Sequence, residues 1–272
     1  MRWITARRRH PAAGYAVVLL MLVAIGMVYA AVTGAGGGSA SASAPPANQQ
    51  QIAQGQNLFA SNCSTCHGLD AQGVPNVAPS LIGVGAAAVD FQVSTGRMPA
   101  KEPGAENPRK PVQLNTSETH AVAAYIASLA GGPAIPSSAQ VSTAGANIAV
   151  GQQLFIANCA QCHNFVGAGG ALTYGKYAPA LTEATPTQLY EAMLTGPEAM
   201  PVFDDGTLTP QNKRDIIAYV TATRAEPNPG GFSLGRIGPV TEGLVAFLGM
   251  LFFMVLAAMW ITAKQRGKTE NS

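Results

Sequence analysis

The chain has 272 residues, of which 47% are hydrophobic and only 11% are charged, and its net charge is +2. This composition is too apolar for one ordinary soluble domain, and it lacks the strong positive charge of a nucleic-acid-binding protein. It therefore indicates a protein that lies partly in a membrane and has no nucleic-acid partner.

The first predicted element is an uncharged apolar run at residues 12–32, which follows a basic cytoplasmic N-terminus at residues 1–11. Such a run is long enough to cross roughly 30 Å of hydrocarbon as a helix. A cleaved secretory signal is the alternative, although the apolar part of a signal is typically about 7–15 residues long. The pattern favours a retained anchor. Residues 33–47 are rich in Gly, Ser, Ala and Pro and predict a flexible linker.

All four cysteines stand in two copies of Cys-x-x-Cys-His. Outside the cytoplasm four cysteines could form disulfides, and a Cys-x-x-Cys pair could bind zinc or act as a thioredoxin-like redox pair, but none of these requires the histidine. The motif is the attachment signature of c-type haem, in which the thiols join the two vinyl groups and the imidazole binds iron. The sequence therefore predicts two covalently bound haem c groups. The residues that hold them are Cys63, Cys66 and His67 in the first copy and Cys159, Cys162 and His163 in the second.

The two motifs belong to a longer internal repeat, because GQNLFASNCSTCH at residues 55–67 matches GQQLFIANCAQCH at residues 151–163. Each copy ends in a helical pattern, at residues 117–129 and 209–224, and Ser117 is predicted to cap the first of these helices. The duplication predicts two related domains.

The remaining segments follow from composition. The two domains are predicted at residues 48–133 and 145–225, with linkers at residues 134–144 and 226–239, a transmembrane helix at residues 240–263 and a cytoplasmic tail at residues 264–272. Basic side chains precede the first apolar run and follow the second. Both termini are therefore predicted in the cytoplasm, and both domains outside it. The protein is thus expected in the cell membrane with two spans.

The sixth ligand of each iron is approached by elimination. His120 is the spare histidine of the exported part, and its place in a helical pattern favours an ordinary half-exposed residue. Met98 and Met200 each precede a proline in a Gly/Pro-rich loop, which favours a role for their sulfur, whereas Met193 in a short helical pattern is expected to fill the core. We therefore predict axial methionines: Met98 opposite the histidine of the first domain, and Met200 opposite that of the second.

Each domain resembles a class I cytochrome c. The resemblance rests on a Gly and a Phe before the haem motif, a Pro after it, the loop Met and a Tyr in the closing helix. These residues are Gly55, Phe59, Pro79, Met98 and Tyr125 in the first domain, and Gly151, Phe155, Pro179, Met200 and Tyr219 in the second. The resemblance implies an all-α fold in which the proline carbonyl accepts the ring N–H of the ligating histidine. The tryptophan that larger family members place near a haem propionate has no counterpart here, so that contact is absent or made differently.

As a whole, tandem class I cytochrome c domains flanked by two transmembrane helices resemble the dihaem cytochrome cc subunit of bcc-type menaquinol:cytochrome c reductases. This resemblance implies cytochrome b and a Rieske iron–sulfur protein as partners, and electron transfer to a terminal haem-copper oxidase. In such a complex the chain is an electron-transfer subunit without an independent catalytic site.

Two other functions stay open. One is an anchored cytochrome subunit of another oxidase or dehydrogenase, and the other is a dihaem peroxidase, which needs an open iron position. The charged, proline-rich loop at residues 99–115 is interpreted as a solvated connection, with a docking loop beside the first haem as the alternative.

Overall fold

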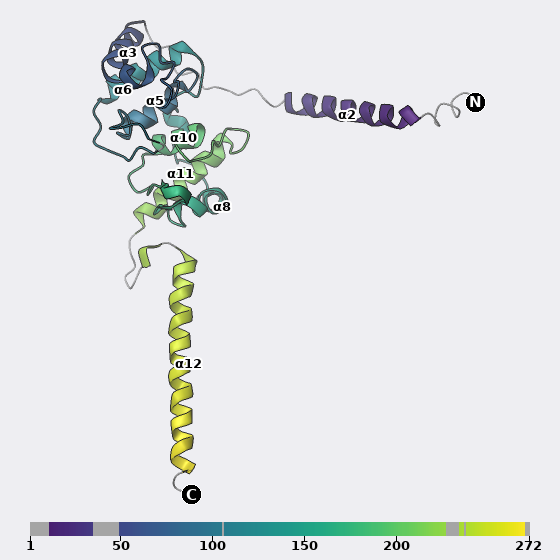
Figure 1. Ribbon diagram of the computed structural model, residues 1–272, viewed down its shortest axis with the longest axis vertical. Helices are drawn as coiled ribbons and strands as arrows, with labels where there is room; N and C mark the ends of the chain where they lie inside the picture. The colour runs from purple at the N-terminus through teal and green to yellow at the C-terminus, as the bar shows by residue number, and fades with distance from the viewer. Residues whose placement is uncertain (1–10, 35–48, 105, 227–233, 237, 270–272) are drawn as a thin grey trace, which may run out of the picture. The chain divides into compact units, whose positions relative to one another are not determined.

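The computed structural model describes residues 11–34, 49–104, 106–226, 234–236 and 238–269. Most of the linker predicted at residues 33–47 and more than half of that predicted at residues 226–239 lie outside the described residues. The described residues are mostly helical (Figure 1), and their one sheet consists of the strands β1 (Gly170–Ala171) and β2 (Tyr177–Ala178). The helical fold class predicted from the sequence is therefore confirmed.

Contacts divide the chain into residues 1–41 and residues 42–272. The first unit contains α2, Pro11–Gly34, a helix formed by the first apolar run. Its side chains from Tyr15 to Val28 are apolar and exposed.

The second unit begins with a domain of four helices. They are α3 (Gln49–Asn62), α4 (Ser64–His67), α5 (Gly85–Ser94) and α6 (Thr116–Leu129). α6 packs against both α3 and α5 (Figure 1). The rings of Phe59 and Tyr125 meet in this core with centroids 5.4 Å apart. The turn α4 is thereby held beside a packed aromatic pair.

The start of α6 differs from the prediction. Asn115, and not Ser117, is the N-cap, because its side chain accepts the Glu118 backbone N–H while the Glu118 carboxylate accepts the Asn115 backbone N–H. This reciprocal capping box satisfies two amide groups at once, which a cap at Ser117 could not do. The prediction of a cap at Ser117 was wrong by two residues.

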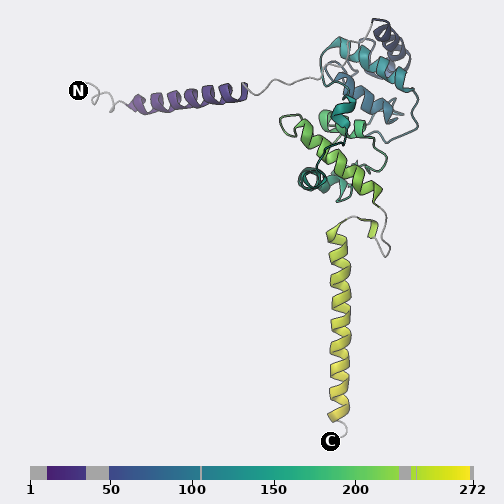
Figure 2. The same cartoon turned by 180° about the vertical axis from the view of Figure 1, so that it is seen from behind.

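The second domain repeats this arrangement with additions. α8 (Ile148–Asn158) packs against α11 (Pro210–Ala225) as α3 packs against α6 (Figure 2). Phe155 and Tyr219 form the matching ring pair, with centroids 5.3 Å apart. Its other elements are α7 (Ser138–Val141), α9 (Ala160–His163), η1 (Thr173–Gly175) and α10 (Pro186–Thr195).

Glycine allows the two helices of each pair to approach closely. A Cβ at Gly151 would stand 1.9 Å from the carbonyl oxygen of Asp215 in α11, and a Cβ at Gly55 would stand equally close to the Ala121 oxygen in α6. No side-chain rotation can relieve a clash with backbone, so the helices would have to separate. The repeated Gly-x-x-x-Phe pattern is thus a packing requirement of both domains.

Gly151→Ala is therefore expected to destabilise the second domain by roughly 1–3 kcal/mol or more, the cost of overpacking. Thermal unfolding of the full chain in detergent, followed by circular dichroism, measures it. Gly206→Ala is the matched control, because the nearest atom to its Cβ would be Asp204 Oδ1 at 3.4 Å. Equal unfolding temperatures for the two variants would contradict the close approach of α8 and α11.

After η2 (Leu234–Arg236), the chain ends in the long helix α12, Pro239–Thr269. Its segment Pro239–Ala263 is long and apolar enough to cross a membrane, and none of that segment is buried in the protein. The second apolar run of the sequence therefore forms a helix with the length and composition of a membrane span.

Candidate functional site

The first Cys-x-x-Cys-His motif forms the single turn α4, directly after α3. His67 on this turn is only 7% exposed, and its Nδ1 lies 2.9 Å from the carbonyl oxygen of Pro79. Since a carbonyl oxygen can only accept, Nδ1 carries the proton and Nε2 is left with a free lone pair. The histidine is thus fixed in the tautomer that can bind a metal through Nε2.

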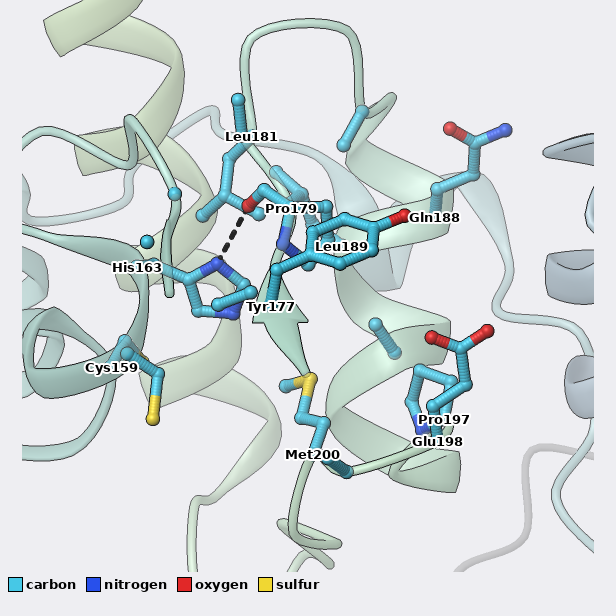
Figure 3. A pocket seen from close by; sticks show the side chains of 18 of the residues that line it. Cys159, His163, Tyr177, Pro179, Leu181, Gln188, Leu189, Pro197, Glu198 and Met200 are labelled. Carbon is cyan, nitrogen blue, oxygen red and sulfur yellow. Dashed lines mark hydrogen bonds between the residues drawn. The ribbon is translucent and has the colours of Figure 1, made fainter. Parts of the chain in front are cut away.

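The second motif has the same geometry on α9. His163 is 9% exposed, and its Nδ1 donates to the carbonyl oxygen of Pro179 at 2.9 Å, the bond drawn in Figure 3. Burial lowers the pKa of His163, an effect that the bond to Pro179 partly offsets. The ring is therefore neutral at neutral pH, which is the form that binds metal ions.

The cysteines are free thiols in the structure, and two of them are strongly affected by burial. Burial, followed by the charge of the neighbouring motif cysteine, raises the pKa of Cys63 to about 11 and that of Cys159 to about 12. Such thiols are protonated at neutral pH and unlike the low-pKa thiolates of redox-active cysteine pairs. Within the part of the chain that the structure describes, no group of three or more His, Cys, Asp or Glu side chains is arranged to hold a metal ion.

A cavity of about 850 Å³ lies in the second domain beside His163. Its lining is mostly apolar and includes both cysteines of the motif and Met200 (Figure 3). This volume is within the range of pockets that hold organic cofactors. A haem fits the residues present, because the cavity offers thiols for attachment, an imidazole nitrogen and a thioether sulfur.

The positions of the three methionines can be compared with their two predicted roles, a core residue or a ligand of the iron. Met193 is 4% exposed in the core of the second domain, which confirms that it is a core residue. Met200 is half-buried against the same core and faces the cavity. In the first domain Met98 packs against the core together with Cys63 and Leu81. Met200 thus lines the same cavity as the second motif, and Met98 packs against the same core as Cys63 of the first motif.

His120 is an ordinary helical residue, as expected. Its side chain is 41% exposed on α6, and its Nε2 lies 3.5 Å from Asp90 Oδ1. It takes no part in either candidate site.

The charged loop at residues 99–115 was interpreted as a solvated connection or as a docking loop beside the first haem. In the structure it contacts the second domain, which neither interpretation included. The backbone N–H of Asn107 donates to Glu198 Oε1 at 2.7 Å, and Arg109 Nη2 donates to Gln188 Oε1 at 3.1 Å. The backbone N–H of Tyr177 donates to the Glu106 carboxylate at 3.3 Å. The density of charge in this loop was the only signal of this role in the sequence.

Sequence reasoning also missed a carboxyl pair between the domains. Glu191 on α10 is fully buried, and it lies within hydrogen-bonding reach of Asp90 on α5, which is 6% exposed. If both carboxyl groups were ionised, neither could donate to the other, and among the described residues no other donor reaches the Glu191 oxygens. Burial and, after it, the nearby Asp90 charge raise the pKa of Glu191 to about 10. Glu191 is therefore protonated and donates to Asp90.

Two helical domains, each with a Cys-x-x-Cys-His turn whose buried histidine is oriented by a proline carbonyl, define a tandem cytochrome c. The Cytochrome c family model matches residues 52–130. The family model "Cytochrome C oxidase, cbb3-type, subunit III" matches residues 146–220.

Curated relatives identify the family more narrowly. The chain is 43% identical over 277 residues to the cytochrome bc1 complex cytochrome c subunit of Corynebacterium diphtheriae, covering 96% of this chain and 98% of that one. It is 47% identical over 218 residues to the subunit of the same name from Mycobacterium leprae, covering 78% and 75%. The chain belongs to the family of cytochrome bc1 complex cytochrome c subunits. It is accordingly a membrane-associated haem c protein that transfers electrons as a component of such a complex.

Other likenesses are more limited. The cbb3-type cytochrome c oxidase subunit CcoP of Rhodobacter capsulatus is 36% identical over 97 residues, which cover 32% of each chain. A chain of the Kuenenia stuttgartiensis reducing HAO-like protein complex aligns with 66% of this chain and 99% of its own length, at 14% identity and a TM-score of 0.33.

Proposed function

We propose that the chain carries two haem c groups and passes electrons from a Rieske iron–sulfur protein to a terminal haem-copper oxidase on the outer face of the membrane. The observation that carries the proposal is the repeated site. In both domains a buried histidine of the motif donates to a proline carbonyl over 2.9 Å. A loop methionine packs against the core of the first domain, and another lines the cavity of the second.

The residues have separate roles in this proposal. Cys63 and Cys66 attach one haem, and Cys159 and Cys162 the other. A haem c held in this way supplies a one-electron iron couple. The axial ligands are His67 with Met98 in the first domain, and His163 with Met200 in the second.

The surroundings of each site suit electron transfer better than peroxide chemistry. The proline carbonyl strengthens the histidine as a ligand, and a thioether sulfur opposite it raises the reduction potential. A methionine at the sixth position leaves no place for peroxide to bind. This ligand set therefore favours a carrier over a dihaem peroxidase.

We further infer two membrane spans with both termini in the cytoplasm. α2 and α12 supply the two apolar helices. Basic residues precede the first apolar run and follow the second. This topology would hold both cytochrome c domains outside the cytoplasm, where a Rieske domain and an oxidase can reach them.

The likeness of the second domain to a cytochrome subunit of cbb3-type oxidases supports contact with an oxidase. It also favours a second candidate function, in which the chain is the anchored cytochrome subunit of an oxidase without a quinol reductase. The two candidates differ in the partners that they require.

Purification of the full chain in mild detergent, with a haem count per chain and identification of the bound subunits, tests the proposal. The expected result is two haems per chain together with cytochrome b, a Rieske protein and haem-copper oxidase subunits. Copurification of oxidase subunits without cytochrome b would favour the second candidate, and one haem per chain would overturn the two-haem assignment.

A further inference from the structure

The cavity of the second domain is completed by residues of the first. Besides the motif residues and Met200, its lining includes several side chains that precede or belong to the charged loop of the first domain. These are Phe91, Arg97, Glu106, Pro108 and Arg109. One wall of the second cofactor site is therefore built by the neighbouring domain.

Arg97 is the most unusual of these residues. It is only 6% exposed, its guanidinium lies 5.1 Å from the centre of the Phe91 ring, and its Nη1 has no hydrogen-bond partner among the described residues. Its Nε lies 3.9 Å from Glu198 Oε1, a long and weak ion pair. Burial lowers the pKa of Arg97. A buried guanidinium with an unused N–H is costly unless a further acceptor binds there.

A second cation lies on the same wall. Arg109 is close enough to Arg97 that their like charges repel, and this repulsion also lowers the pKa of Arg97. Arg109 Nη2 donates to the neutral Gln188 side chain. The cavity lining also includes Glu106, Glu183 and Glu198. The unused N–H of Arg97 and the neutral partner of Arg109 nevertheless leave donors for an anionic ligand.

The carboxylates of this wall do not supply all of the missing acceptors. Glu198 Oε1 accepts the backbone N–H of Asn107 at 2.7 Å, and both Glu106 oxygens are approached by the backbone N–H of Tyr177 at 3.3 Å. Burial raises the pKa of Glu198 above its ordinary value. The positive charge of Arg97 therefore has room for another partner.

The position of the arginines within the cavity suits one end of a haem. In Figure 3, Cys159 and His163 lie on one side of the cavity, while Gln188 and Glu198, which contact Arg109 and Arg97, lie on the other. In a haem c the thioether bonds and the two propionate carboxylates are on opposite edges of the macrocycle. The carboxylates of a haem attached to the second motif thus face the side where the arginines lie.

We propose that Arg97 and Arg109 of the first domain bind the propionate carboxylates of the haem in the second domain. The inference rests on the proposed function, because it requires a haem at Cys159 and Cys162. Arg97 directly precedes Met98, the proposed axial ligand in the first domain. One dipeptide therefore touches both cofactor sites and fixes the position of one relative to the other.

Arg97→Gln in the full-length, haem-loaded chain tests the proposal. A cation beside the propionates favours the reduced haem, so its removal is expected to lower the midpoint potential of the second haem more than that of the first. The propionate bending mode in the resonance Raman spectrum should shift as well, because it reports hydrogen bonding to the carboxylate. Met200→His marks which potentiometric wave belongs to the second haem, since it changes only that haem's ligand.

Two further variants keep the test decisive. Arg97→Lys retains the charge, so it should keep the potential near the original value while still shifting the propionate mode. If Arg97→Gln loses haem, Arg97→Lys takes its place in the test. Arg214→Gln is the control, because Arg214 donates to the carbonyl oxygens of Ser142 and Ala144 outside the cavity lining.

A propionate mode that is unchanged in both Arg97 variants, or a potential shift confined to the first haem, would overturn the assignment. That outcome would still show two potentiometric waves and leave the proposed function intact. A count of one haem per unsubstituted chain would instead contradict the two-haem proposal itself.

Discussion

Leucine in place of Met200 is expected to remove the sulfur-to-iron charge-transfer band of one haem and to lower that haem's midpoint potential. Leucine keeps most of the side-chain volume but has no sulfur, so the packing of the loop against the core is retained. Axial ligands set haem potentials over a range of about 0.8 V, and the loss of the thioether removes the ligand that raises the potential. Optical spectra of the oxidised chain and a potentiometric titration measure both effects.

Met193→Leu is the matched control for this prediction. Met193 also lines the cavity but is buried in the core, so its replacement should leave the band and both potentials unchanged. Met98→Leu should remove the band of the other haem. If the spectrum of Met200→Leu kept both bands, another residue would have to be the sixth ligand of the second haem.

Raising the pH from about 5 toward 10 is expected to lower the free energy of unfolding of the chain through Glu191, which lies at the contact between α5 and α10. The pKa of Glu191 is raised from its ordinary value of 4.5 to about 10, so between these values the folded chain binds a proton that the unfolded chain has lost. The free energy of unfolding then falls with rising pH, by up to about 1.4 kcal/mol per unit. His120 is the neighbouring base, next to Asp90.

Glu191→Gln removes this titration while it keeps the shape of the side chain and a donor toward Asp90. The variant should be more stable than the original chain at neutral and alkaline pH, and its stability should depend less on pH. Thermal unfolding of the haem-loaded chain in detergent at pH 6 to 9 provides the comparison. Asp70→Asn serves as an exposed control, and a pH dependence that is equal in all three proteins would exclude Glu191 as its source.

Local signals in the sequence were sufficient to predict the turns and the helix starts around each site. The Cys-x-x-Cys-His motifs lie on short turns after α3 and α8, and Thr185-Pro186 and Thr209-Pro210 begin helices because a threonine cap and a proline in the first turn act within a few residues. The Ser117 prediction failed within the same short range, because Asn115 and Glu118 satisfy more amide groups together.

The contacts between the domains could not be foreseen in the same way. Arg97 and Glu198 are far apart in the sequence, as are Asp90 and Glu191, and no local pattern reports which surfaces of two domains meet. In the sequence Arg97 is simply the residue before a predicted ligand. Its burial against another domain depends on tertiary packing, which composition and periodicity do not record.

The burial of Cys159 has a consequence for how the protein is made. In the folded chain Cys159 is only 9% exposed, and burial raises the pKa of its thiol to about 12. Both effects oppose the reaction of a thiol in the folded domain. If a haem is attached at Cys159 as proposed, we expect its thioether bond to form while α8 and α11 are still apart, before the second domain closes around the cofactor.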